Sequence, residues 1–139
     1  MFRLISLMFL VSVFYSQFSL RAGMIFPSEE HAKNLVSFGG GYTLLENEKM
    51  PLNIIAEYSF ADELTVIEFG PNLMFGLNEH IFLQASALYS RESSHGISHS
   101  DIAVIVGAAY ELNHHLGIEL LYGINGDIKG PRIGLSFRL

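Results

Sequence analysis

Histidine, serine and aspartate gather in one polar stretch, R-E-S-S-H-G-I-S-H-S-D, in the second half of the chain. His95, His99 and Asp101 could contribute metal ligands, and a histidine beside Ser98 or Ser100 could activate a nucleophile. A metal site needs three or four converging ligands, and nucleophilic catalysis also needs an oxyanion site. The spacing supplies neither, so we predict a solvated connection with no catalytic residue, metal ligand or cofactor. All six histidines are expected in connections between elements.

Charged residues also recur at alternate positions among glycine, serine and asparagine, where they could pair with one another. In a confined interior a charge is costly unless an opposite charge accompanies it. We predict an interior network of ion pairs among Arg21, Glu57, Glu68, Glu111, Glu119, Arg132 and Arg138. Such a network would act as a structural plug, and a narrow polar path is the alternative.

Eight runs of alternating apolar and polar side chains must position these residues. Alternation with period two predicts β-strands with one apolar face each. Turn-forming residues separate the runs, which favours an antiparallel sheet of consecutive strands. The predicted strands cover residues 17–26, 35–45, 51–60, 65–76, 81–90, 101–112, 116–124 and 131–139.

The last run, P-R-I-G-L-S-F-R-L, has one wholly apolar face and one small or cationic face. We predict that it pairs with the first run and closes an eight-stranded antiparallel up-and-down β-barrel. The interior of eight strands is just filled by side chains, so an open pore is not expected. Pro71 follows Gly70 inside the fourth run, which predicts a bulge or a local kink.

Strand directions give the interior charges a height in this barrel. Arg132 is expected near Glu57 and Glu68 at one end. Arg138 is expected near Glu111 at the other end, and the remaining arginine and glutamate lie between the two groups.

The apolar face could point inward, as in a soluble cup for an apolar ligand, or outward to lipid. Lipid is favoured because the polar face carries small residues, whereas all three lysines lie in connections. Connections at one end are also longer than those at the other, as in membrane barrels. Aromatic residues of the apolar face sort into two girdles, with Phe26, Phe60, Tyr89 and Tyr122 at one end and Tyr42, Phe75, Tyr110 and Phe137 at the other.

The first sixteen residues differ from the rest. Arg3 precedes an apolar run, and Ser16 is a small residue before a cleavage point, so residues 1–16 are predicted as a signal peptide and 17–139 as the barrel domain. Cleavage after Ala22 would remove part of the first strand. The absence of cysteine excludes a lipoprotein, and the net charge of −6 argues against nucleic-acid binding.

Four segments carry a resemblance to a known family: G-G-G-Y-T-L, P-L-N-I-I-A-E-Y-S-F, V-G-A-A-Y-E-L-N-H-H-L-G-I-E-L-L-Y-G-I and I-G-L-S-F-R-L. They resemble the small outer-membrane β-barrel proteins of bacteria, which include opacity-like and outer-membrane protein A-like barrels. The resemblance covers nearly the whole mature chain and implies an outer-membrane location, with membrane lipid and the barrel-assembly machinery as partners. The family usually ends on phenylalanine, whereas here Leu139 is last and Phe137 lies two residues before it.

We therefore expect a monomeric, non-enzymatic outer-membrane barrel with a plugged lumen and a structural or surface-interaction role. The sequence does not identify a surface ligand. One alternative is a lipid-modifying enzyme that uses the loop from His95 to Asp101, although the seventh run lacks the His-x-Ser pair such barrels carry. The other alternative is a soluble periplasmic barrel that binds an apolar ligand.

Overall fold

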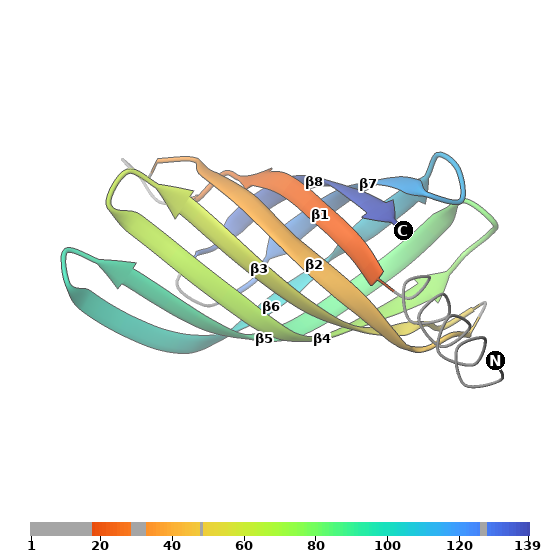
Figure 1. The fold of residues 1–139 in the computed structure, drawn as a ribbon, viewed down its shortest axis with the longest axis horizontal. Helices are drawn as coiled ribbons and strands as arrows, with labels where there is room; N and C mark the ends of the chain where they lie inside the picture. Colours follow the sequence, from red (N-terminus) through yellow and green to blue (C-terminus); the bar gives the residue numbers. More distant parts are fainter. Residues whose placement is uncertain (1–17, 29–32, 48, 126–127) are drawn as a thin grey trace, which may run out of the picture.

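The computed structural model describes residues 18–28, 33–47, 49–125 and 128–139, which form a closed barrel (Figure 1). Each strand pairs antiparallel with the next, and β1 pairs with β8. The predicted barrel topology is confirmed, while the predicted signal peptide lies outside the described residues. The strands are β1 (Phe18–Ile25), β2 (Leu35–Leu45), β3 (Leu52–Ala61), β4 (Leu64–Gly76), β5 (Ile81–Ser94), β6 (Ile97–Glu111), β7 (Leu116–Gly123) and β8 (Gly130–Arg138). Within the described residues, no helix is long and apolar enough to cross a membrane.

The connections divide between the two ends of the barrel, which we name after them. The hairpin end, on the left in Figure 1, carries residues 26–28, 33–34, 62–63, 95–96, 124–125 and 128–129. The turn end, on the right, carries residues 46–47, 49–51, 77–80 and 112–115.

The β5–β6 hairpin is longer than predicted and extends beyond its neighbours in Figure 1. Residues 91–100 were expected to form the longest connection, but they continue the two strands and leave only His95 and Gly96 as the turn. These two residues have φ of 50° and 79°, as a two-residue type I′ turn requires. The expectation failed because serines dominate this stretch, so no apolar alternation marked it as strand. The connection at 62–63 is equally short, so long connections do not distinguish this end.

Pro71 interrupts one ladder without shifting its register. The β3–β4 pairing runs through Gly70 and Pro71, whereas the β4–β5 pairing omits both residues and resumes in the same register. The sequence predicted a bulge or a kink at this position. The structure instead has a gap in the β4–β5 ladder, because proline has no N–H to donate. The register shift that does occur lies between Thr43 and Leu45, in the β2–β3 pair.

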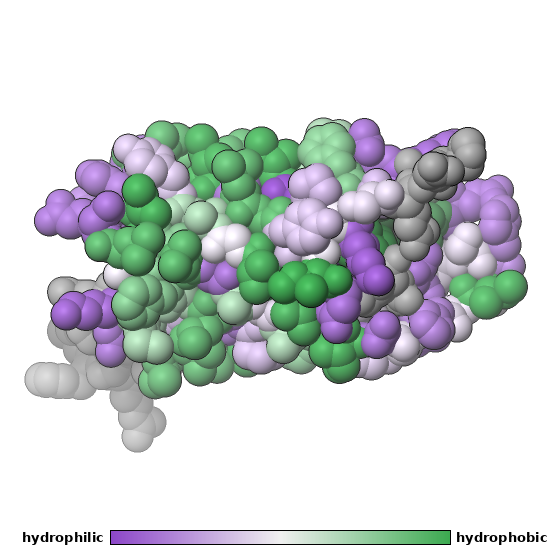
Figure 2. Space-filling model, turned by 180° about the vertical axis from the view of Figure 1, so that it is seen from behind, coloured by the Kyte–Doolittle hydropathy of each residue, from purple (hydrophilic) through white to green (hydrophobic). Residues whose placement is uncertain are grey.

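The apolar face of the strands points away from the barrel axis. Leu120 is 62% exposed, and Phe38 and Ile67 are each 54% exposed. Figure 2 shows hydrophobic residues over the middle of one side and hydrophilic residues toward both ends. A soluble barrel would bury this face, so the soluble-cup alternative is contradicted.

Close contact between strands requires glycine on the inner face. A Cβ atom added to Gly107 of β6 would lie 2.2 Å from the carbonyl oxygen of Leu120 on β7. That oxygen belongs to the sheet backbone and cannot easily move. Glycine at this position therefore allows β6 and β7 to approach each other.

Candidate functional site

The interior of the barrel holds a buried ion pair that joins β4 to β8. The Arg132 guanidinium donates from Nη1 to Glu68 Oε1 at 2.6 Å and from Nη2 to Glu68 Oε2 at 3.1 Å. Glu68 is 1% exposed and Arg132 is 6% exposed. Two parallel bonds between a guanidinium and a carboxylate are strong and directional, so they tie two strands that are distant in the sequence.

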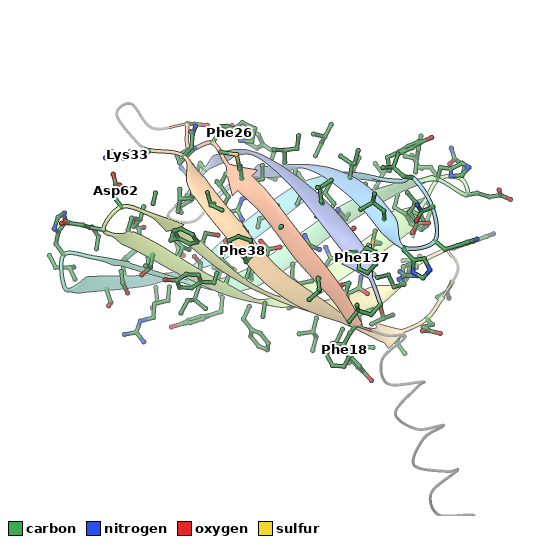
Figure 3. The ribbon with its side chains drawn as sticks, turned by 45° about the horizontal axis from the view of Figure 1, so that its top comes forward. Phe18, Phe26, Lys33, Phe38, Asp62 and Phe137 are labelled. Atoms are coloured by element: carbon green, nitrogen blue, oxygen red, sulfur yellow. The ribbon has the colours of Figure 1, made fainter. Side chains whose placement is uncertain are left out.

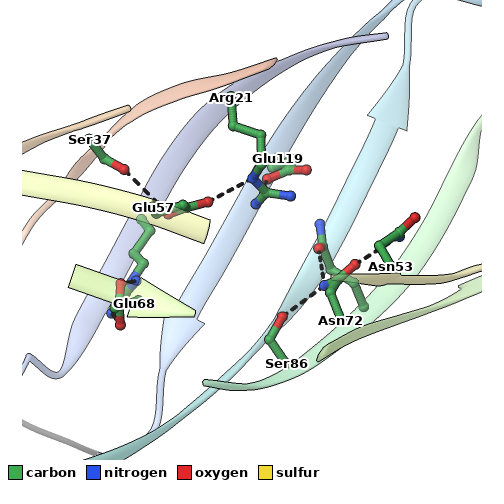
Figure 4. A network of polar contacts seen from close by, with 10 residues as sticks. Arg21, Ser37, Asn53, Glu57, Glu68, Asn72, Ser86 and Glu119 are labelled. Carbon is green, nitrogen blue, oxygen red and sulfur yellow. Dashed lines mark hydrogen bonds and ion pairs between the residues drawn. The ribbon is translucent and has the colours of Figure 1, made fainter. Parts of the chain in front are cut away.

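A second cluster centres on Arg21 of β1, which contacts two carboxylates (Figure 4). Its Nε donates to Glu57 Oε1 of β3 at 2.7 Å, and its Nη2 donates to Glu119 Oε2 of β7 at 2.6 Å. The Ser37 hydroxyl of β2 donates to the other oxygen of Glu57 at 3.3 Å. One guanidinium therefore links strands on opposite sides of the closing seam.

Two of the expected partnerships differ in the structure. Glu57, expected beside Arg132, is held by Arg21. Glu111 and Arg138 line the same cavity at the turn end, but the contacts of the described residues include no ion pair between them. Arg138 is exposed, because it lies at the last position of β8, where the lumen opens to solvent.

A network of neutral polar groups fills the other side of the lumen (Figure 4). Thr43 donates to Asn53 Oδ1 at 2.8 Å, and Asn53 donates to Asn72 Oδ1 at 3.2 Å. Asn72 in turn donates to Gln84 Oε1 at 2.9 Å and to Ser86 Oγ at 2.8 Å. The chain carries amides on the inward face of β3, β4 and β5, and this pattern is the sequence signal that would have predicted the network.

Apolar side chains also point inward, in two clusters that the sequence did not single out. One joins Ile55, Leu88, Ala103 and Ile105, with Leu121 packed against it. The other lies at the hairpin end and joins Ile25, Leu35, Val66 and Ile128, with Ala61 and Leu64 against it. Because these residues share a face with the charges, alternation alone did not reveal them.

Cavities lie on both sides of the Arg21 cluster. One of about 20 Å³ is bordered by Arg21, Glu119 and Arg132, and one of about 70 Å³ lies toward the turn end. Arg21 and Glu119 line both cavities, so their ion pair forms part of the boundary between them.

The hydroxyl and carboxylate groups of the polar hairpin bond to groups within the same hairpin. The Ser98 hydroxyl pairs with Ser93 at 3.2 Å, and Ser100 Oγ accepts from the Tyr89 hydroxyl at 2.9 Å. The Asp101 carboxylate accepts the N–H of Ile102 at 2.7 Å. Among the described residues, no group of three or more His, Cys, Asp or Glu side chains could hold a metal ion.

Ion pairs connect the loops at the hairpin end. His95 Nδ1 lies 2.6 Å from Glu63 Oε2, which joins the β5–β6 turn to the β3–β4 turn. Lys33 pairs with Asp62, and Figure 3 shows these two side chains close together. The hydrogen bond to Asp62 raises the pKa of Lys33 above its ordinary value. Both pairs are exposed, so each is expected to stabilise the loops only weakly.

The predicted girdle residues lie on the outer wall. Seven are exposed, and Tyr42 is half-buried. In Figure 3, Phe137 lies toward the turn end and Phe26 at the hairpin end, both pointing away from the barrel. Phe38 and Tyr58 add aromatic rings between the girdles, since both pack near Phe60 with ring centroids 6.3 Å and 5.8 Å away.

Solved structures with a similar fold are membrane barrels. The designed transmembrane barrel TMB2.3 matches with a TM-score of 0.69 at 17% identity, covering 89% of this chain and 94% of that one. The outer membrane protein Ail of Yersinia pestis, in a phospholipid bilayer nanodisc, matches with a TM-score of 0.58 at 14% identity, covering 89% and 99%. Neisserial surface protein A matches with a TM-score of 0.53 at 16% identity, covering 89% and 98%.

This chain is an eight-stranded transmembrane β-barrel of the outer-membrane type. The outward apolar wall and the fold shared with these structures support that conclusion together. No family model and no curated protein matches the sequence. The barrel is therefore identified by its fold, and its activity must be inferred from its own residues.

Proposed function

We propose that the protein is a non-enzymatic outer-membrane barrel whose filled lumen makes it a rigid support for surface contacts. The observation that carries this proposal is the bidentate pair of Arg132 and Glu68 across a lumen also occupied by apolar clusters. Buried pairs and packed side chains leave little room for solute passage. Because solute transport is therefore not expected, we assign the barrel two roles. It supports the envelope mechanically, and it displays the β5–β6 hairpin.

Planar-bilayer recording tests the plugged lumen. The purified barrel should produce no steady single-channel current in a bilayer held at constant voltage. The Arg21→Ala variant removes the guanidinium that borders both cavities, and brief openings would then show that this cluster blocks the path. Steady conductance by the unaltered barrel would contradict the proposal.

The surface role rests on the β5–β6 hairpin, which projects furthest at the hairpin end (Figure 1). We propose that this end faces the outside of the cell and that the turn end faces the periplasm, because the β5–β6 ladder continues to Ser94↔Ile97 at this end and lifts its turn away from the wall. A protease added to intact cells should cleave slowly after Arg91, which is exposed but paired on both sides, each time the hairpin opens. Cleavage only after the outer membrane is permeabilised would reverse the orientation.

Assembly forms the last part of the proposal. We propose insertion as a monomer by the barrel-assembly machinery, with β8 presenting the alternating apolar residues Ile133, Leu135 and Phe137 to lipid. Depletion of that machinery in cells should leave the protein unfolded and sensitive to periplasmic proteases. Heat-modifiable gel mobility of the membrane fraction is the measurement, and unchanged mobility after depletion would contradict this route.

A further inference from the structure

The three connections at the turn end share one hydrogen-bonded geometry that the proposed function leaves unused. In each, an asparagine side chain accepts the N–H groups of the residues two and three positions later. The pairs are Asn47 with Lys49 and Met50 at 3.0 and 3.4 Å, Asn78 with His80 and Ile81 at 2.8 and 2.9 Å, and Asn113 with His115 and Leu116 at 2.8 and 2.9 Å. The motif Asn-x-basic-apolar thus repeats around this rim.

The basic residue of each turn is joined to the next hairpin of the barrel. Its carbonyl oxygen accepts a main-chain N–H at 2.7 Å in every case: Lys49 from Gly76, His80 from Glu111, and His115 from Arg138. All three basic residues are exposed. The fold therefore places one basic side chain at each turn, at the same position of the same motif.

The two imidazole rings are also fixed against the outer wall. His80 Nδ1 lies 3.2 Å from the carbonyl oxygen of Glu111, and its ring stacks on Tyr110 with centroids 5.9 Å apart. His115 repeats this arrangement, with a main-chain carbonyl of β8 at 3.0 Å and the Phe137 ring at 6.0 Å. Because a carbonyl oxygen can only accept, Nδ1 carries the hydrogen, and Nε2 remains for another partner.

These rings lie at the level where lipid headgroups are expected. Tyr110 and Phe137 belong to the turn-end girdle, and aromatic girdles of membrane barrels lie at the interface between hydrocarbon and water. Glu46 and Glu79 add negative charge to this rim, and Glu111, His114 and Arg138 line the same cavity as His115. This rim therefore places Lys49, His80 and His115 at the expected level of the headgroups.

We propose that Lys49, His80 and His115 bind the phosphate groups of anionic phospholipids in the leaflet at the turn end. This inference rests on the proposed function, because it requires the apolar wall to lie in a bilayer. A protonated imidazole donates a charge-assisted hydrogen bond to a phosphate oxygen. The stacked rings are already ordered, so little freedom is lost when a headgroup binds.

A single tryptophan can report which lipids surround this rim, since the chain contains none. The Phe137→Trp variant places the fluorophore beside His115. It is refolded in phosphatidylcholine vesicles that contain a small share of brominated phosphatidylglycerol, or brominated phosphatidylcholine as the reference lipid. At about pH 5.5, the anionic lipid should quench the fluorescence several-fold more than the reference lipid.

Further substitutions in the Phe137→Trp variant test whether the lipid preference comes from this site or from the overall charge of the protein. Replacing both rim histidines, His80→Gln with His115→Gln, should lower the quenching ratio clearly below that of the parent variant, and adding Lys49→Gln should bring it close to one. His95→Gln, at the hairpin end, should leave the ratio unchanged. Equal quenching by the two lipids in the parent variant would overturn the inference.

Two further measurements complete the test. One identifies the source of the bound phosphate, and the other shows whether each variant is folded. Loss of the preference on adding millimolar inorganic phosphate would assign the site to free phosphate and overturn the lipid proposal. Heat-modifiable gel mobility shows whether each variant forms the barrel in vesicles. If the unaltered chain fails to do so, the proposed function fails, whereas a folded barrel without lipid preference refutes only this inference.

Discussion

At the scale of single residues, the interior charges matter because their burial makes each one dependent on its partner. Arg132 and Glu68 are both nearly excluded from solvent and bond to each other twice. Removing one member of such a pair leaves an uncompensated charge, which is far more costly than the net contribution of the intact pair. Arg138 is exposed to solvent, so its charge does not depend on a protein partner.

The Arg132→Ala variant should lose about 3 to 5 kcal/mol of unfolding free energy, because the buried Glu68 carboxylate is left without its partner. Urea unfolding of the barrel in lipid vesicles measures this loss. Arg138→Ala is the matched control and should change stability by less than about 1 kcal/mol. Similar losses in both variants would show that burial does not decide the effect. Replacing the pair together, with Arg132→Met and Glu68→Leu, should restore most of the stability.

At the scale of elements, the β5–β6 hairpin depends on its turn. Gly96 has φ of 79°, in the left-handed region that glycine adopts without cost, and an added Cβ would meet no atom within 4 Å. A substitution there therefore strains the backbone without creating a steric clash. The consequence is a local effect on the hairpin that leaves the barrel wall intact.

The Gly96→Val variant should destabilise the hairpin by about 1 to 2 kcal/mol, because a β-branched residue is disfavoured at positive φ. The measurement is the rate of protease cleavage after Arg91 in the folded protein, which should rise by roughly tenfold. Gly96→Asn is the control, since asparagine tolerates this conformation, and it should cleave at nearly the parent rate. Equal cleavage of the two variants would indicate that the turn does not control hairpin order.

The sequence predicted strand bounds well wherever apolar and polar side chains alternate. β2 has the predicted bounds, and the bounds of β7 differ by one residue, because apolar side chains alternate along both. The end of β5 was missed, since its last residues are polar on both faces. The pairing of Arg21 with Glu57 was also missed, because strand tilt sets which heights meet across a barrel, and alternation specifies only the face.

At the scale of the whole molecule, the outward apolar wall determines where the protein can fold. Its middle is the part that membrane hydrocarbon must cover, and hydrophilic residues occupy both ends (Figure 2). A charge introduced into a barrel wall should therefore cost more in the middle than at an end.

The Leu120→Arg variant tests this depth dependence, because Leu120 lies within β7 and is 62% exposed. It should lose about 2 to 4 kcal/mol of folding free energy in vesicles, whereas Ile124→Arg, just beyond the end of β7, should lose about 1 kcal/mol or less. Equilibrium refolding from urea into vesicles gives both values. Equal costs at the two positions would argue against a bilayer centred on the middle of the wall.

The two-residue turn at His95 and Gly96 also limits how far the β5–β6 hairpin extends from the rest of the barrel. Five residue pairs, from Ser90↔Asp101 to Ser94↔Ile97, continue the β5–β6 ladder past Tyr89, a predicted girdle residue. At about 3.3 Å per residue, they give the hairpin a reach of about 16 Å along the strands. With the orientation proposed above, a partner that stays outside a thick carbohydrate coat would lie beyond that range. The proposed surface role would then suit molecules that come down to the lipid surface itself.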